Sequence, residues 1–198
     1  LGGVVLKWGA LLLSLCACGS PAVPVPPAPT PPAPTPPAPT AANHSIYALN
    51  VPLVGEDGAA YGLDVERGHP VLMSMFYTTC PMACPLLIER VKGILDEAGP
   101  AASDARVLLV SMDPASDDVA ALKQAWTERG LDSRWHLAAP LPAQMREVAA
   151  LLDIQVRQSP DGGFAHTSVV VLLDEEGRPI ARAEGDEGRS ELIAALRR

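Results

Sequence analysis

Cysteine is scarce in this chain of 198 residues, and the shortage limits what can hold the fold together. Of the four cysteines, Cys16 and Cys18 fall within the first twenty residues. Only Cys80 and Cys84 remain for the rest of the chain, which excludes a disulfide scaffold there. We therefore expect this pair to serve chemistry; the alternative is two inert, buried structural cysteines.

Aromatic residues and positive charge are scarce as well. Aromatic residues make up 4% of the chain, so its core must be built from aliphatic side chains and methionine. The formal net charge is −8, with the acidic residues spread singly, which argues against a nucleic-acid partner and against electrostatic binding to anionic lipids. The length suits one substantial domain and is short for two.

The first apolar run, residues 4–17, is too short for a comfortable membrane span and has the length of a signal-peptide core. It leads into Leu15-Cys16-Ala17-Cys18-Gly19-Ser20, which resembles a bacterial lipoprotein cleavage box. We expect a lipoprotein-type signal peptide at 1–17 and lipidation at Cys18, with a short uncleaved anchor as the alternative. The remaining chain would then lie in the cell envelope, on the periplasmic side of the membrane.

A proline-rich stretch follows. Residues 21–40 hold eleven prolines and three tandem copies of Pro-Pro-Ala-Pro-Thr, a composition that cannot pack a core. An extended polyproline chain of this length would reach roughly 60 Å, at about 3.1 Å per residue. We predict a tether at 18–43 and a folded domain at 44–198; the tether would let the domain visit a membrane partner or serve as a passive stalk.

The two remaining cysteines lie in Phe76-Tyr77-Thr78-Thr79-Cys80-Pro81-Met82-Ala83-Cys84-Pro85. A strand-like run, 71–77, precedes the motif, and a helical pattern to about Ala98 follows it. Both sulfurs can therefore converge where a buried strand meets a helix N-terminus, whose free amides and dipole favour a thiolate. The pair could form a disulfide or ligate one soft metal ion.

The other patterns predict an α/β fold of the thioredoxin-like type, with a mostly parallel central sheet flanked by helices and an N-terminal β-hairpin. The hairpin is indicated by alternation at Tyr47, Leu49, Val51 and Leu53 before an Asp57-Gly58 turn, with a return at Leu63 and Val65. The remaining expected strands are 106–111, 135–138, 167–173 and 180–183, and the expected helices are 116–129 (capped by Ser116 or Asp117), 142–152 and 188–197.

His166 stands immediately before the expected strand 167–173, next to the strand–helix junction in this topology. Two thiolates and one imidazole suit Cu(I), and can accept Cu(II) with an added ligand. Zinc would usually want a fourth protein ligand or a water. Cys80, Cys84 and His166 are therefore candidate ligands of a soft metal ion, and the resemblance described next implies that they are copper ligands. His44, His69 and His136 are assigned ordinary surface or packing roles, and Met73 and Met75 are assigned to the core.

In these motifs the sequence resembles the Sco family of copper-handling, membrane-tethered, thioredoxin-like proteins. The resemblance spans about 47–196 and rests on the cysteine motif, Ser111-Met112-Asp113-Pro114 and His166-Thr167-Ser168. It implies delivery of copper to the copper A centre of cytochrome c oxidase during assembly, with the copper A subunit, a copper donor chaperone and a thiol reductant as partners. Asp113 would position a turn near the site.

The resemblance implies a metallochaperone rather than an enzyme. Two alternatives stay open: a thiol–disulfide reductase of the oxidase's copper-ligand cysteines, and a copper or redox sensor. The family often has Asp after Cys-Pro, whereas this chain has Met82. Its thioether is a soft donor that could contact copper during transfer, or an apolar group that contacts the partner.

Overall fold

The computed structural model describes residues 2–3, 45–159 and 163–198. Apart from residues 2–3, the predicted signal peptide lies outside the described residues, as do Cys18, the tether and His44. The chain's contacts separate Leu1–Pro36 from Pro37–Arg198, and all the elements below belong to the second unit. Within the described ranges, no helix combines the length and the apolar character needed to cross a membrane.

The described residues form nine strands, four α-helices and three short 3-10 helices. The strands are β1 Leu53–Gly55, β2 Ala60–Tyr61, β3 Val71–Phe76, β4 Arg106–Ser111, β5 Trp135–Pro140, β6 Val156–Gln158, β7 Phe164–His166, β8 Val169–Leu173 and β9 Pro179–Glu184. The α-helices are α1 Ala83–Ala98, α2 Val119–Glu128, α3 Met145–Leu151 and α4 Arg189–Leu196, and the 3-10 helices are Ile46–Ala48, Leu63–Glu66 and Gly99–Ala102.

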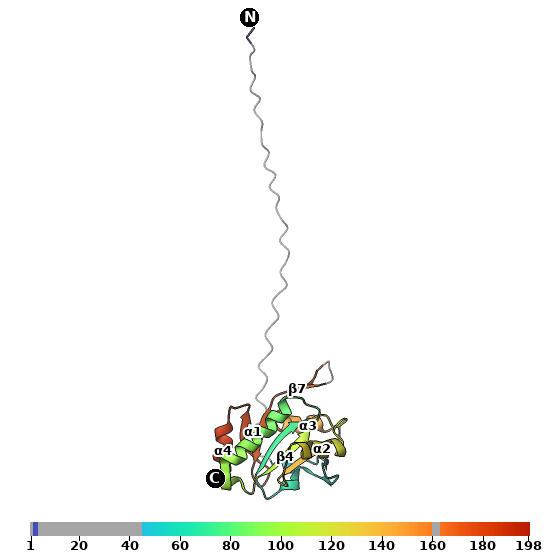
Figure 1. Ribbon diagram of the computed structural model, residues 1–198, viewed down its shortest axis with the longest axis vertical. Helices are drawn as coiled ribbons and strands as arrows, with labels where there is room; N and C mark the ends of the chain where they lie inside the picture. The colour runs from blue at the N-terminus through green and yellow to red at the C-terminus, as the bar shows by residue number, and fades with distance from the viewer. Residues whose placement is uncertain (1, 4–44, 160–162) are drawn as a thin grey trace. The chain divides into compact units, whose positions relative to one another are not determined.

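Seven strands form one sheet in the order β2-β1-β5-β4-β3-β8-β9, flanked by the helices (Figure 1). This confirms the predicted α/β fold with a central sheet. The mostly parallel arrangement needs a correction: β5, β4 and β3 are parallel, but β1 and β8 join them antiparallel. The reason is that each edge of the sheet is a β-hairpin, β1–β2 on one side and β8–β9 on the other.

The central strand β3 is buried along its whole length, as expected for a strand covered on both faces. Met73 and Met75 lie in it at 0% and 1% exposure, so their prediction as core residues is confirmed. Helices α1 and α4 pack against each other, and α4 also packs on β9. The end of β3, where the cysteine motif begins, is therefore fixed by a packed core.

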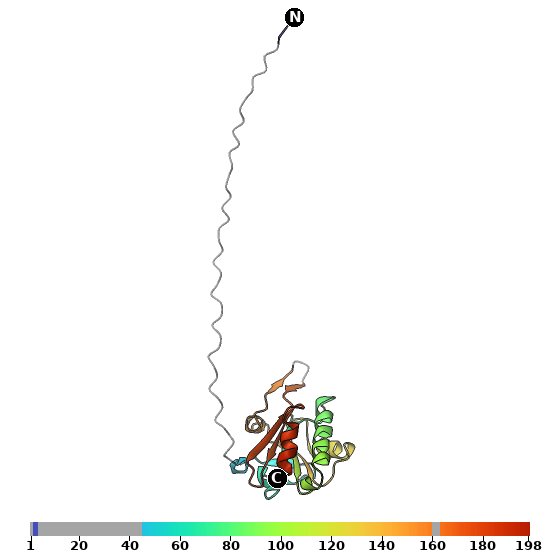
Figure 2. The same ribbon diagram turned by 90° about the vertical axis from the view of Figure 1, so that its left-hand side faces the viewer.

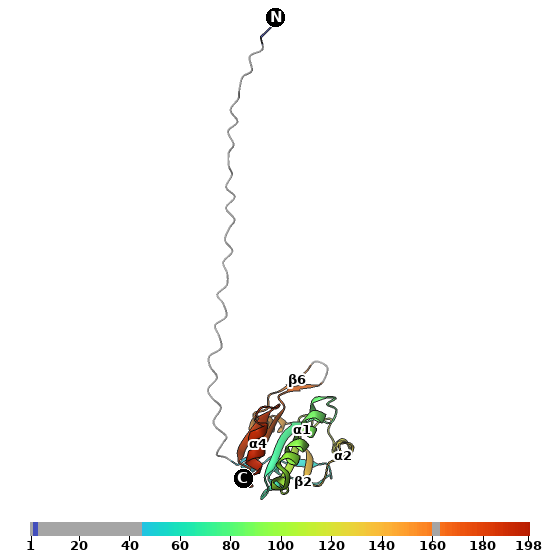
Figure 3. The same cartoon turned by 60° about the vertical axis from the view of Figure 1, so that its left-hand side comes forward.

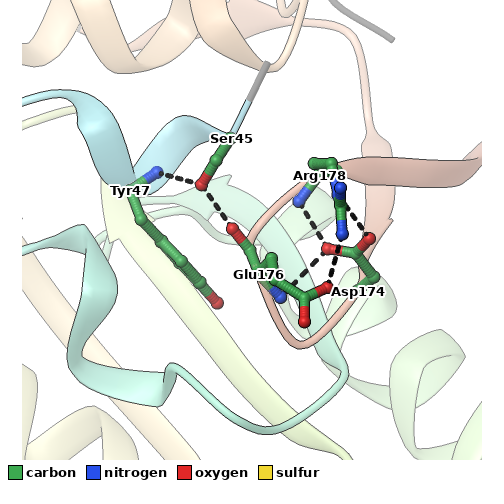
Figure 4. Close-up of polar contacts among 5 residues, drawn as sticks. All are labelled: Ser45, Tyr47, Asp174, Glu176 and Arg178. Atoms are coloured by element: carbon green, nitrogen blue, oxygen red, sulfur yellow. Dashed lines mark hydrogen bonds and ion pairs between the residues drawn. The ribbon is translucent and has the colours of Figure 1, made fainter. Parts of the chain in front are cut away.

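The N-terminal hairpin is shorter than predicted. Ile46–Ala48 is a 3-10 helix instead of a strand, because the Ser45 hydroxyl accepts a hydrogen bond from the Tyr47 amide and caps the turn. Ser45 also donates to the Glu176 carbonyl, and the Ile46 amide donates to the Gly177 carbonyl at 2.9 Å. The start of the described domain is thus held on the β8–β9 turn (Figure 4).

Arg178 stiffens the same turn through Asp174, with its Nε 2.9 Å from a carboxylate oxygen (Figure 4).

The return strand of the N-terminal hairpin is Ala60–Tyr61, and the predicted return at Leu63 and Val65 is instead a 3-10 helix, Leu63–Glu66. Gly62 is the N-cap of that helix, and the turn of the helix ends the strand after only two residues.

One element was not predicted. The expected strand 167–173 begins only at Val169, and the residues before it form a separate two-stranded sheet of β6 and β7. This hairpin extends from the folded unit at the end where α1 begins (Figures 2 and 3). His166 is the last residue of β7 and pairs with Val156, so the predicted third ligand belongs to the hairpin and not to the main sheet.

Candidate metal centre

The cysteine pair lies at the junction between β3 and α1. Met82 occupies the N-cap position of α1 and makes no side-chain capping hydrogen bond. Instead, the amide of Cys84 donates to the sulfur of Cys80, with N and Sγ 3.2 Å apart. The first amides of a helix have no partner within the helix, so the Cys80 sulfur takes the place of a capping oxygen.

Both cysteines are free thiols, and both are buried, Cys80 at 6% and Cys84 at 3% exposure. The predicted convergence of the two residues at a strand–helix junction is thus confirmed. Pro81 and Pro85 each directly follow one of the cysteines, at the start of the helix, where proline is tolerated because no backbone donor is needed there.

The two thiols differ in acidity. Burial opposes ionisation of Cys80, but hydrogen bonds from the Cys84 thiol, the amides of Cys84 and Met82, and the Tyr77 hydroxyl outweigh it and lower the pKa of Cys80. Burial raises the pKa of Cys84, against a hydrogen bond from the Tyr77 amide, and the nearby Cys80 and Asp117 add to the rise. The expectation of a thiolate-favouring site is confirmed for Cys80 and wrong for Cys84, because Cys84 is buried deeper and faces negative charge.

Tyr77 touches every part of the centre. Its amide nitrogen lies 3.5 Å from Cys84 Sγ, and its hydroxyl hydrogen-bonds the Cys80 sulfur. Its ring makes edge-to-face contacts with Phe164 and with His166, at centroid separations of 5.3 and 6.4 Å. The β6–β7 hairpin therefore packs on the cysteine loop through the Tyr77 side chain.

His166 has a defined orientation. Its Nδ1 lies 3.1 Å from the carbonyl oxygen of Thr167. A carbonyl can only accept, so Nδ1 carries the proton, and Nε2 is left as the nitrogen with a free lone pair. A metal-binding imidazole usually donates its other ring N–H to an oxygen in this way, which fixes the orientation of the ring.

The three predicted ligands are not assembled into one cluster. Across the described ranges, no three His, Cys, Asp or Glu side chains are grouped closely enough to hold a metal ion. The structure brings together the sulfurs of Cys80 and Cys84, and it places His166 beside Tyr77 at the edge of the same region. The ligand set of Cys80, Cys84 and His166 therefore stays a prediction.

Two other histidines have carboxylate partners. His69 Nδ1 lies 3.0 Å from Asp104, and His136 lies between Glu66 at 3.0 Å and Glu56 at 3.7 Å. These contacts agree with the ordinary surface and packing roles predicted for both residues.

The sequence pointed to Asp113 near the site, and the structure adds Asp117. The carbonyl of Asp113 accepts hydrogen bonds from the amides of Ser116 and Asp117, at 3.0 and 2.9 Å, so Asp113 forms the turn after β4. The cap of α2 is Asp118, and not Ser116 or Asp117 as predicted. Asp117 instead turns inward, is 1% exposed, and binds the cysteine loop at Thr78. In the run Ser116-Asp117-Asp118 the sequence does not show which residue caps the helix and which is buried, so the buried role of Asp117 was not predicted.

Two large apolar side chains next to the cysteines face solvent: Met82 is 70% exposed and Leu86 is 59% exposed. Met82 separates the two cysteines in sequence, and Leu86 lies in the first turns of α1. We call these two residues the apolar rim of the centre. Exposed apolar side chains beside a reactive group are typical of a surface that contacts another protein.

A cysteine pair at the end of a central strand and the start of the next helix, in a helix-flanked sheet, defines a thioredoxin-like dithiol protein. Within that class the chain belongs to one family: the SCO1/SenC family model matches residues 42–198. No curated protein sequence matches the chain.

Solved structures resemble this one at low sequence identity. A SCO1/SenC family lipoprotein from Bacillus anthracis shares 18% identity over 75% of this chain and 92% of its own, with a TM-score of 0.67. Copper-bound ScoI from Bradyrhizobium japonicum shares 23% sequence identity over 74% of this chain and 94% of its own, with a TM-score of 0.61. BsSco is a member of the Sco family of cytochrome c oxidase assembly proteins in which a disulfide switch was identified. It shares 20% sequence identity over 73% of this chain and 88% of its own, with a TM-score of 0.62. At these identities the likeness shows the fold.

Proposed function

We propose that this protein is a copper metallochaperone that delivers copper to the copper A centre of cytochrome c oxidase during assembly. The observation that carries the proposal is the pair of free thiols at the start of α1, with the Cys80 sulfur hydrogen-bonded by the Cys84 amide at 3.2 Å. Membership of the SCO1/SenC family supports it. So does the similarity to a ScoI protein solved with copper bound, and to BsSco, which belongs to a family of oxidase assembly proteins.

The donor set fits copper as cargo. Cys80 and Cys84 would supply two thiolates and His166 the nitrogen Nε2, a soft set that suits Cu(I) and that can accept Cu(II) with an added ligand. Because His166 is not grouped with the sulfurs here, we infer that the end of β7 moves toward the cysteine loop when copper is held. Of the two cysteines, Cys80 has the lowered pKa and Cys84 the raised one, so copper capture would begin at Cys80 and end with loss of the Cys84 proton.

Release would proceed by ligand exchange. Thiolates of the recipient replace the ligands one at a time, and the apolar rim of Met82 and Leu86 contacts the recipient beside them. A disulfide between Cys80 and Cys84 would remove both thiolates and so stop copper binding until a thiol reductant restores them.

The unequal thiols favour a second candidate function, a thiol–disulfide reductase of the oxidase's copper-ligand cysteines. Cys80, with its lowered pKa, would attack a partner disulfide, and the more buried Cys84 would resolve the mixed disulfide. The partner leaves with two thiols, this protein retains the disulfide, and an external thiol reductant must supply two electrons to restart the cycle. This activity needs no third ligand.

We further propose that the domain is attached to the periplasmic side of the membrane through lipidated Cys18 and the tether at 18–43. A SCO1/SenC relative from Bacillus anthracis is a lipoprotein, which supports this attachment. The tether would set how far from the membrane the domain can meet the copper donor and the copper A subunit.

The experiment that separates carrier from reductase is a Cu(I) titration against a competing chelator, on the full-length reduced protein. Replacing His166 by Ala should weaken Cu(I) binding tenfold or more, or about 1.4 kcal/mol. The Cys80–Cys84 reduction potential should move by less than about 30 mV. His69→Ala, a substitution at a surface histidine, is the matched control. If His166→Ala binds Cu(I) like the parent and still supports oxidase maturation, the reductase is the better description.

A further inference from the structure

Asp117 is a buried carboxylate for which copper delivery, as proposed above, has no use. It lies in the turn between β4 and α2 and is 1% exposed. The amide of Thr78 donates to its two oxygens at 3.1 and 3.2 Å, and the Thr78 hydroxyl donates to it at 2.5 Å. The Ser111 hydroxyl, at the end of β4, donates at 2.6 Å.

These donors are all neutral, and burial raises the pKa of Asp117 in spite of the hydrogen bonds from Ser111 and Thr78. A buried carboxylate without a charged partner is costly to a fold. A residue held at such a cost is a candidate for function, and its partners indicate which function.

The partner it holds most firmly is the loop that carries Cys80. The Tyr77 amide donates to Cys84 Sγ at 3.5 Å, while the next amide, that of Thr78, donates to Asp117. The Cys80 amide in turn donates to the Tyr77 carbonyl at 3.2 Å. The backbone that contacts both cysteines is therefore fixed at its middle by the Asp117 carboxylate.

Asp117 is itself held in place. Its amide donates to the Asp113 carbonyl at 2.9 Å, and the Asp113 amide donates to the Ser111 hydroxyl at 2.9 Å. The turn after β4 thus presents the carboxylate to the loop after β3, and the two strands are parallel neighbours in register. Positions 78, 111, 113 and 117 form one connected network beneath the cysteines.

We propose that Asp117 is the positioning residue of the dithiol: by holding Thr78 it keeps the two sulfurs close and so favours closure of the Cys80–Cys84 disulfide. In that step each thiol loses a proton and the sulfurs bond. A disulfide oxidant such as oxidised glutathione takes up the two electrons and two protons and becomes two thiols. Asp117 would thereby set how readily copper binding is switched off, a role that rests on the proposed function.

The test is the equilibrium constant of that exchange with glutathione, measured on the full-length protein without copper. Asp117→Asn keeps the shape but removes the negative acceptor. The constant for disulfide formation should fall at least tenfold, or about 30 mV, because the sulfurs lose their enforced proximity. Thr78→Val, which removes only the hydroxyl bond, should lower it about threefold. Asp118→Asn, the neighbouring acid that caps α2, is the matched control and should leave it unchanged.

Thermal unfolding of each variant separates positioning from plain stability. If Asp117→Asn unfolds earlier but the exchange constant stays within twofold of the parent, Asp117 is only a structural residue and the proposal is overturned. If Asp117→Asn does not fold, Thr78→Val decides: an unchanged constant overturns the proposal. Because no copper is present, failure of the parent to bind copper would refute the proposed function and leave this test intact.

Discussion

The ring of Tyr77 lies edge-on to the ring of His166, with the centroids 6.4 Å apart. The same tyrosine hydrogen-bonds the Cys80 sulfur through its hydroxyl. Tyr77 therefore contacts both His166, the predicted third ligand, and Cys80, the thiol with the lowered pKa, although His166 and the two sulfurs are not grouped into one site.

The first prediction concerns that hydroxyl. Tyr77→Phe keeps the ring contacts with Phe164 and His166 but removes a donor that stabilises the Cys80 thiolate. The rate at which iodoacetamide modifies Cys80 at pH 7 should fall by roughly tenfold, since a hydrogen bond to a charged group contributes about 1.5–3 kcal/mol. The measurement is alkylation rate against pH, with the modified cysteine identified by mass spectrometry. A profile identical to the parent's would show that the hydroxyl does not support the thiolate.

The second prediction is a pH dependence of stability. Burial raises the pKa of Asp117 in the folded protein above its ordinary value of 3.8. The folded state then binds this proton more tightly than the unfolded state does, so the parent loses stability as the pH rises from about 4 through the raised pKa, and levels off above it. Asp117→Asn lacks this loss. Urea unfolding at several pH values should therefore show that the free energy of unfolding of the parent rises relative to that of Asp117→Asn as the pH falls. A difference between the two proteins that does not change with pH would contradict this prediction.

Much of the fold could be predicted from the sequence because its strongest signals are local. The run Arg106 to Ser111 is apolar enough to be a buried strand and is β4 with the predicted bounds. The helix after the cysteines ends at Ala98 as predicted, before Gly99, whose positive φ of 65° favours glycine.

The parts that could not be predicted depend on contacts between distant segments. The pairing of β6 with β7 joins a polar run, 156–158, to 164–166, and neither run has the apolar alternation of a strand facing the core. The role of Asp117 depends on Thr78, 39 positions away. The acidities of the two thiols differ because of burial depth, which spacing does not reveal.

The third prediction tests the lipid anchor. If Cys18 is the lipidated residue after cleavage of residues 1–17, Cys18→Ser should release the domain from membranes or leave an unprocessed precursor. Fractionation of a bacterial host followed by mass spectrometry of the mature N-terminus checks this. Cys16→Ser is the control and should stay membrane-bound. An unmodified, water-soluble N-terminus in the parent would rule the anchor out.

The fourth prediction concerns the tether. If residues 21–40 act through reach alone, a scrambled segment of the same composition should support oxidase maturation like the parent, because polyproline stiffness follows from composition. Deletion of all twenty residues removes roughly 60 Å of reach and should impair maturation. Oxidase activity in membranes measures both. Full activity after the deletion would place the recipient site close to the membrane surface.

The last prediction separates the two possible roles of the apolar rim. Met82 is 70% exposed and Leu86 59% exposed, so neither contributes much to the core, and both are free to be covered by a recipient. Fully burying such a side chain is worth about 1.5–3 kcal/mol. Met82→Ser and Leu86→Ser should therefore each slow copper transfer to the recipient's copper A domain about tenfold and leave Cu(I) affinity within threefold. Ile180→Ser, at a 48% exposed apolar residue on β9, is the matched control and should change neither quantity. If Met82→Ser alone also weakens Cu(I) binding tenfold, its thioether is a copper contact, because the loss then follows the soft donor and not the apolar area.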